Sequence, residues 1–296
     1  MSASIRALTD TRHALGEGIV WDDRQGVLRW TDILASTLWQ CDPVDRSTRH
    51  WALPARLGCM ALTQDPDRLL LALEKQLVMF DLRNGAMEPL ADIEPGLPDT
   101  RSNDGRCDRH GNFIFGSINE HGSERIASFY RYSADGVLSR MALPRAAITN
   151  SICFSPDGNT MYFCDTPTRQ IMACDYDGAS GEVDRIRVFT EVPAQFGTPD
   201  GSTVDAEGFL WNAEWGASRV VRYAPDGRVD TVIMMPASQP SCISFMGTGL
   251  DRLAITSAHD GIDAAERERH PLHGAVFTLE APRGRGLPES RYGRTA

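Results

Sequence analysis

The sequence predicts an all-β fold: a six-bladed β-propeller of four-stranded antiparallel blades, with the ring closed by an N-terminal strand. Three observations carry this prediction. A pattern of polar residue, short apolar strand and tight turn recurs along the chain. It recurs at intervals typical of blades, and no long amphipathic helix separates the strands, as a doubly wound sheet would require.

The pattern is clearest between Gly197 and Ala213. There the segment Pro199-Asp200-Gly201 is expected to turn and to place Asp200 at the start of a strand over 202–204. A second turn, Asp205-Ala206-Glu207-Gly208, then leads into a strand over 209–212. Counting back five positions from the residue that opens the equivalent turns returns Glu17, Asn103 and Asn150.

Six strand beginnings fall at 17, 60, 103, 150, 200 and about 241, with spacings of 43, 43, 47, 50 and 41 residues. The remaining strands are expected at 27–31, 37–41, 69–73, 77–81, 112–117, 128–132, 161–165, 170–175, 219–223, 253–257 and 275–279. Residues 5–8 are expected to supply the closing strand, and 263–269 a short surface helix. We therefore expect one domain over 1–296, in which 281–296 is a polar tail that frays.

Composition narrows the class of partner. A net charge of −10 disfavours nucleic acid and anionic membrane surfaces, both of which require a basic face. No apolar run approaches the roughly 20 residues of a membrane span, and the N-terminus lacks the pattern of a secretory signal, so we expect a cytoplasmic protein. Seven cysteines without a Cys-x-x-Cys pair are expected to be reduced and buried. A small molecule is the expected partner, with no obligate protein partner evident.

The recurring polar residues predict a cation site. The innermost strands of a propeller line a central shaft, so equivalent positions converge on one point. Glu17, Asn103, Asn150 and Asp200 would offer carboxylate and amide oxygens there, a donor set that suits a hard divalent cation. Asp104 and Asp165 are alternative ligands. Three acids at the opposite ends of the strands are expected to form turns only: Asp22, Asp108 and Asp205.

Four motifs in this order resemble the gluconolactonase/regucalcin (SMP-30) family, and the resemblance covers nearly the whole chain. They are Leu15-Gly16-Glu17-Gly18, Arg101-Ser102-Asn103-Asp104-Gly105, Asn150-Ser151 with Ser155-Pro156-Asp157-Gly158, and Pro199-Asp200-Gly201. The resemblance implies that Glu17, Asn150 and Asp200 bind the metal and that Arg101, Asn103 and Glu120 contact substrate. His121 stands where some members carry a second acid.

The resemblance implies a metal-dependent hydrolase that opens a sugar lactone to the sugar acid. A single divalent cation, calcium first, with zinc, magnesium, manganese or iron(II) as alternatives, would polarise the lactone carbonyl, and Asp200 would position or activate water. Two alternatives remain open: a calcium-binding regulatory propeller without turnover, and a metal-dependent esterase acting on other esters.

Overall fold

A computed structural model of the chain describes residues 5–281 and 283–294. Within these ranges it contains six four-stranded antiparallel sheets, so the predicted six-bladed β-propeller is confirmed. The chain divides into two compact units: unit 1 within Met1–Arg56 and Val192–Pro288, and unit 2 within Leu57–Glu191 and Glu289–Ala296. The interpretation of 1–296 as one domain stays a prediction.

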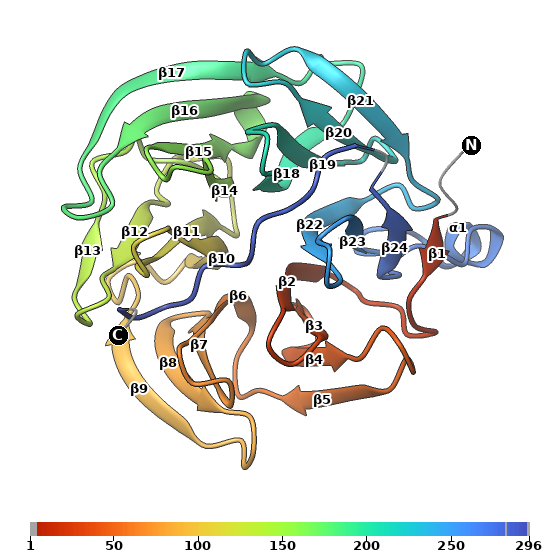
Figure 1. The fold of residues 1–296 in the computed structure, drawn as a ribbon, viewed down its shortest axis with the longest axis horizontal. Helices are drawn as coiled ribbons and strands as arrows, with labels where there is room; N and C mark the ends of the chain where they lie inside the picture. Colours follow the sequence, from red (N-terminus) through yellow and green to blue (C-terminus); the bar gives the residue numbers. More distant parts are fainter. Residues whose placement is uncertain (1–4, 282, 295–296) are drawn as a thin grey trace. The chain divides into compact units, whose positions relative to one another are not determined.

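Unit 1 contains blades 1, 5 and 6 (Figure 1). Blade 1 is β2 (Gly16–Asp22), β3 (Val27–Asp32), β4 (Thr37–Cys41) and β5 (Thr48–Ala52). Blade 5 is β18 (Thr198–Val204), β19 (Leu210–Trp215), β20 (Arg219–Tyr223) and β21 (Val229–Met234). Blade 6 is β22 (Pro240–Met246), β23 (Arg252–Ser257), β24 (Phe277–Glu280) and β1 (Arg6–Ala7). The inner strand β22 lies between β2 and β18.

Unit 2 contains blades 2, 3 and 4. Blade 2 is β6 (Leu57–Leu62), β7 (Arg68–Leu73), β8 (Gln76–Asp81) and β9 (Met87–Asp92). Blade 3 is β10 (Thr100–Cys107), β11 (Phe113–Asn119), β12 (Phe129–Tyr132) and β13 (Leu138–Arg140). Blade 4 is β14 (Thr149–Phe154), β15 (Thr160–Asp165), β16 (Gln170–Tyr176) and β17 (Val183–Glu191), with a 3₁₀ turn over Thr166–Thr168. The inner strand β10 lies between β6 and β14.

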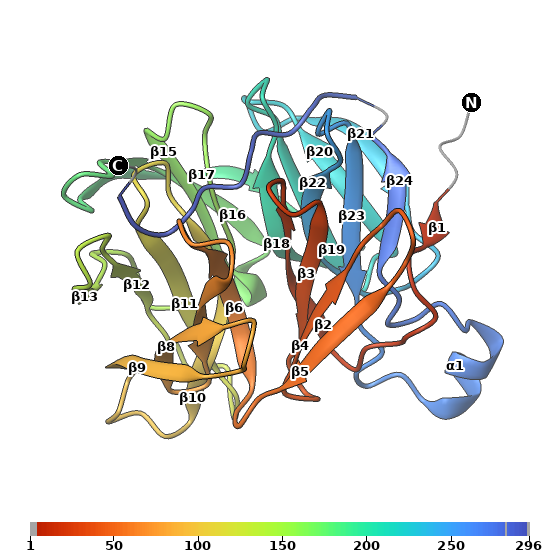
Figure 2. The same cartoon turned by 60° about the horizontal axis from the view of Figure 1, so that its bottom comes forward.

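The N-terminal strand completes blade 6, as predicted. Arg6 pairs with Thr278 and Ala7 with Phe277, which makes β1 the outer strand beside β24 (Figure 2). The expected surface helix is also confirmed: α1 (Ala264–Arg269) leaves blade 6 between β23 and β24, and the Asp263 side chain caps it by accepting from the Glu266 amide at 2.8 Å. None of the helices in the described part of the chain is long and apolar enough to cross a membrane.

The blades are held together by apolar side chains on both faces of their strands. Successive strand residues point to opposite faces, and Leu70 and Leu71 of β7 are both fully buried. Strand β7 is therefore covered on both faces, and the burial of each such leucine contributes roughly 1.5–3 kcal/mol to the stability of the fold. All seven cysteines are buried thiols, as expected, and burial raises the pKa of Cys41 to about 11.

The C-terminal segment departs from the expectation. In unit 1 the Gly286 amide donates to the Leu250 carbonyl at 2.7 Å. In unit 2 the Tyr292 amide donates to the Leu62 carbonyl at 2.7 Å, and its ring stacks on Tyr132 with a centroid separation of 5.4 Å. The prediction of a fraying tail is thus wrong for 283–294, because Tyr292 anchors this polar segment by its ring.

Candidate functional site

All six innermost strands carry a register irregularity near their beginning, among the residues that the structure describes. The pairing shifts between Glu17 and Val20, Leu57 and Cys59, Ser102 and Gly105, Asn150 and Cys153, Pro199 and Ser202, and Pro240 and Ile243. Such bulges bend a strand and redirect its side chains. Every expected ligand of the cation lies at or inside one of these bulges.

The structure corrects the expected register. Glu17 and Asn150 are the last paired residues before their bulges, whereas Asn103 and Asp200 lie inside theirs. Counting from the sequence therefore aligned these residues only to within one position. The position counted in blade 2, Met60, is not equivalent, because it pairs regularly with Leu71 beyond the bulge.

The segment Pro199-Asp200-Gly201 is part of β18 rather than a turn before it. Asn212 Nδ2, on the neighbouring strand, donates to the Asp200 backbone carbonyl at 3.0 Å and to the Ser202 hydroxyl at 2.9 Å, which fixes the bulge. A Cβ at Gly201 would lie 2.7 Å from the Ser241 carbonyl oxygen, so only glycine fits. The expectation of a turn was wrong because bulges and turns favour the same residue types.

In unit 1, Glu17 and Asp200 flank the bulge of β22. The Ser241 hydroxyl in that bulge donates to the Gly16 carbonyl at 2.5 Å, while its carbonyl packs against Gly201 on the other side. Asp200 is 5% exposed, and Glu17 is half-buried with Oε2 accepting from the Gly18 amide at 3.2 Å. Two buried or partly buried carboxylates are thus placed on the strands adjacent to β22.

In unit 2 a chain of hydrogen bonds joins the other four expected residues. Arg101 Nε donates to Glu120 Oε1 at 3.1 Å, and Arg101 Nη1 donates to Asn103 Oδ1 at 2.9 Å. Asn103 Nδ2 then donates to Asn150 Oδ1 at 3.2 Å, and Asn150 Nδ2 donates to Thr166 Oγ1 at 3.0 Å. Because both amides donate through nitrogen, their oxygens have a defined orientation.

Lys75, in the turn between β7 and β8, is a neighbour of this chain that the sequence did not indicate. Its Nζ donates to the Leu97 carbonyl at 2.6 Å and to Thr100 Oγ1 at 2.9 Å, directly before Arg101. Burial lowers the pKa of Lys75, although the charge of nearby carboxylates, Glu120 among them, opposes this. Lys75 thereby fixes the backbone from which Arg101 projects.

The alternative ligands Asp104 and Asp165 have structural roles. Asp104 accepts from the amides of Gly105 at 2.9 Å and of Ile152 in the next blade at 2.8 Å, and burial raises its pKa. Asp165 accepts from the Ala147 and Ile148 amides and pairs with Arg125. Both carboxylates therefore join neighbouring chain segments.

The three turn acids form their turns as predicted, but they are not confined to that role. Each accepts backbone amides within its own turn, as Asp205 does from Glu207 and Phe209 at 3.0 Å. Each also accepts a hydrogen bond from a buried side chain of another strand. These partners are Arg29 for Asp22, Tyr176 for Asp108 and Arg222 for Asp205.

Two histidines of the loop before β24, His270 and His273, differ in exposure. His270 is exposed, but His273 is 6% exposed and its Nδ1 accepts from the Ser238 backbone amide at 3.2 Å. His273 is buried because its loop folds back onto blade 6.

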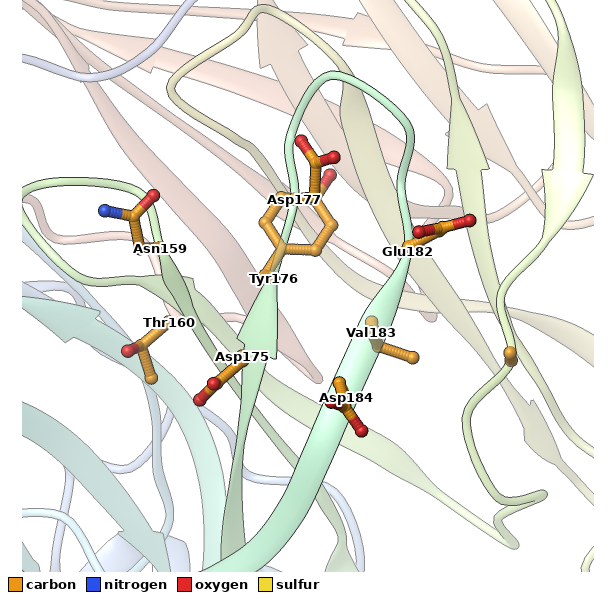
Figure 3. Close-up of a pocket in the computed structure, with 9 residues that line it drawn as sticks. Asn159, Thr160, Asp175, Tyr176, Asp177, Glu182, Val183 and Asp184 are labelled. Atoms are coloured by element: carbon orange, nitrogen blue, oxygen red, sulfur yellow. The ribbon is translucent and has the colours of Figure 1, made fainter.

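Figure 3 shows a pocket in blade 4. None of the expected site residues lines it. Asp175, Asp177, Glu182 and Asp184 line it, from β16, β17 and the turn between them. Asp175 pairs with Arg187 at 2.9 Å, and Asp177 accepts from the Ala179 amide and the Ser180 hydroxyl at 2.9 Å. These two acids stabilise the turn and the edge of the blade, so they do not indicate a binding site.

Within 5–281 and 283–294, no group of three or more His, Cys, Asp or Glu side chains is gathered as a metal site. The expected ligands are of a different kind, two carboxylates and an amide, with Glu17 and Asp200 in unit 1 and Asn150 in unit 2. Their assignment stays a prediction.

The chain belongs to the family described as SMP-30/Gluconolactonase/LRE-like region, whose model matches residues 15–259. It is 47% identical to an L-arabinolactonase of Azospirillum brasilense over 97% of this chain and 95% of that protein. It is 33% identical to a 6-deoxy-6-sulfogluconolactonase of Pseudomonas putida, with 94% of each covered.

Among solved structures, the chain is similar to a calcium-binding protein, regucalcin, from Agrobacterium tumefaciens strain C58. The two share 32% sequence identity, each is covered to 98%, and the TM-score is 0.93. The resemblance inferred from the four motifs is therefore confirmed at the level of the family.

Proposed function

We propose that the protein is a metal-dependent sugar lactonase that hydrolyses an aldonolactone to the free sugar acid, with L-arabino-lactone as the first candidate substrate. The observation that carries the proposal is the full-length similarity to an L-arabinolactonase at 47% identity. The hydrogen-bonded residues of unit 2 support it, because an arginine fork, two amides and a carboxylate suit a polyhydroxylated neutral ligand.

Glu17, Asn150 and Asp200 would hold the cation. Two carboxylates and one amide oxygen, without thiolate or imidazole, fit a hard ion, so calcium is the first candidate, and zinc, magnesium, manganese and iron(II) are alternatives. A bound cation would polarise the lactone carbonyl and stabilise the negative charge that develops on its oxygen. It would also relieve the repulsion between the two carboxylates.

Asp200 is the proposed catalytic residue. Its carboxylate would orient the attacking water and accept its proton as the water oxygen bonds to the lactone carbonyl carbon. The bond between that carbon and the ring oxygen then breaks, the ring oxygen takes up a proton, and the open hydroxy acid is released. Because Asp200 is 5% exposed, bulk water competes little for its carboxylate.

Arg101, Asn103 and Glu120 would bind the sugar. The Arg101 guanidinium can donate to hydroxyl or carbonyl oxygens, and Glu120, with its side chain 19% exposed, can accept from a sugar hydroxyl. The bond between Arg101 and Glu120 would keep both groups in place before substrate arrives, which lowers the entropy cost of binding.

The first test is acid release from a panel of lactones, followed in a pH-stat with chelator-stripped protein reloaded with single metals. We expect activity above spontaneous hydrolysis on L-arabino-lactone, loss of that activity after stripping, and recovery with one divalent ion. Activity that survives complete stripping would contradict the metal dependence. Failure to hydrolyse any lactone of the panel would contradict the proposed lactonase activity.

A calcium-binding propeller without turnover is the second candidate. The similarity to a structure described as a calcium-binding protein favours it. Calcium binding without hydrolysis of any lactone or ester in the panel would support this candidate, whereas preference for simple esters over lactones would support an esterase. The net charge of −10 supports a small neutral substrate over nucleic acid. The cytoplasmic location and the absence of an obligate protein partner stay predictions.

A further inference from the structure

An exposed aromatic side chain lies just before β18. Phe196 is 42% exposed in the loop that connects to Thr198, and its amide donates to the Pro193 carbonyl at 2.9 Å. Several other exposed large apolar side chains of unit 1 lie on the outer strand β21, namely Val229, Val232 and Met234. Phe196 instead lies at the end of blade 5 where the inner strand begins.

The Phe196 ring packs on a guanidinium that is held by buried charged and polar groups. The guanidinium carbon of Arg219 lies 3.5 Å from the ring centroid. Arg219 Nε in turn donates to Glu214 Oε2 at 2.5 Å, and the Tyr223 hydroxyl donates to Glu214 Oε1 at 2.7 Å. Glu214 is fully buried, and Arg219 and Tyr223 are 9% and 2% exposed.

This support is costly to build. Removing a carboxylate and a guanidinium from water carries a desolvation cost that their mutual attraction does not always offset. A phenylalanine that merely protrudes into solvent needs no such fixed partner. The cation–π contact fixes the orientation of the ring, and the buried Glu214 fixes the cation.

Phe196 lies four residues before Asp200, in the loop that leads into the same inner strand. Pro199 pairs with Glu214 and Thr198 with Trp215, so Glu214, which holds Arg219, lies opposite the residue directly before Asp200. A side chain at Gly197 would collide with the Trp215 carbonyl, which shows how closely the loop packs on β19. Four residues of extended chain span at most about 13 Å, which sets the upper limit on the separation of the Phe196 and Asp200 backbones.

We propose that Phe196 is a specificity-determining residue whose ring packs against the apolar C–H face of the sugar ring of the substrate. The proposal rests on the lactonase function proposed above and adds its substrate class: cyclic sugar lactones with C–H bonds gathered on one face. Aromatic faces carry partial negative charge and attract such C–H groups, and contact removes apolar surface of both partners from water.

The test compares Phe196→Ala and Phe196→Trp with wild type, and uses Val232→Ala as the matched control, since Val232 is 43% exposed on β21 of the same blade. We expect Phe196→Ala to raise KM for the sugar lactone about tenfold, with kcat within about twofold, and Phe196→Trp to restore KM. KM for the unsubstituted γ-butyrolactone should change much less, because it lacks the sugar substituents. Unchanged KM for the sugar lactone in Phe196→Ala would overturn the proposal and leave the lactonase intact.

A second measurement does not depend on turnover. L-Arabinose, which lacks the lactone carbonyl, is used as the ligand in saturation-transfer NMR. Saturation should pass from the protein to the C–H protons of the sugar ring in wild type and Val232→Ala, and this transfer should be lost in Phe196→Ala. Equal transfer in all three proteins, or no binding to wild type, would overturn the proposed role of Phe196. A positive result with an inactive wild type would contradict the lactonase proposal alone.

Discussion

Asp200→Asn is expected to lower kcat/KM for the sugar lactone by roughly 10²–10⁴-fold, the usual contribution of a general base. An amide of the same shape cannot accept the proton of the attacking water, and it loses the charge that attracts a cation. The fold should persist, because Asn212 binds the Asp200 backbone carbonyl rather than its side chain. Steady-state kinetics on metal-loaded protein, with the melting temperature as a check of folding, measure the effect.

Asp226→Asn is the matched control for this substitution. Asp226 is an exposed turn residue of blade 5 that pairs with Arg228, and its removal should leave kcat/KM unchanged. Retention of more than a tenth of wild-type activity by Asp200→Asn would contradict the role assigned to Asp200.

Arg29→Met is expected to produce the largest loss of stability. The side chains of Arg29 and Asp22 are fully buried, and Arg29 Nη1 lies 2.7 Å from Asp22 Oδ2. Removing the Arg29 guanidinium leaves the buried Asp22 carboxylate without its main partner, which should lower the free energy of unfolding by about 3 kcal/mol. This value is near the lower end of the usual range because Arg24 remains 3.3 Å from Asp22 Oδ1. Urea unfolding monitored by tryptophan fluorescence gives the change in unfolding free energy.

Arg228→Met provides the comparison for this prediction. The Arg228 side chain is exposed, so its ion pair with Asp226 is screened by water and its loss should not shift the urea midpoint measurably. Equal midpoints for Arg29→Met and wild type would show that the buried pair contributes nothing to stability.

The fold could be predicted from the repeat, but the outermost strand of most blades could not be located in the sequence. The outer strands over 48–52, 87–92, 138–140, 183–191 and 229–234 were expected only as the fourth members of their blades. Their residues are mostly exposed, so they lack the apolar runs that mark the inner strands. Strands buried on both faces, such as β7, carry the strongest signal in the sequence.

The candidate site could be predicted as a set of residues, but its geometry could not. The sequence does not distinguish a bulge from a turn at Pro199-Asp200-Gly201, since both require glycine and a polar neighbour. It also gave no spacing signal for Lys75 or Phe196, which lie in connections between strands. Their roles depend on which segments the sheet pairing brings together.

Glu17, Asn150 and Asp200 are proposed to bind one divalent cation. Isothermal titration of stripped protein with calcium tests it most directly, on wild type, Glu17→Gln, Asn150→Ala, Asp200→Asn and the control Asp226→Asn. We expect one ion per chain for wild type and Asp226→Asn, and at least about tenfold weaker binding, equivalent to about 1.4 kcal/mol, in each of the other three variants. Wild-type affinity in all three variants would contradict the claim, as would the failure of wild type to bind calcium or any of the alternative cations.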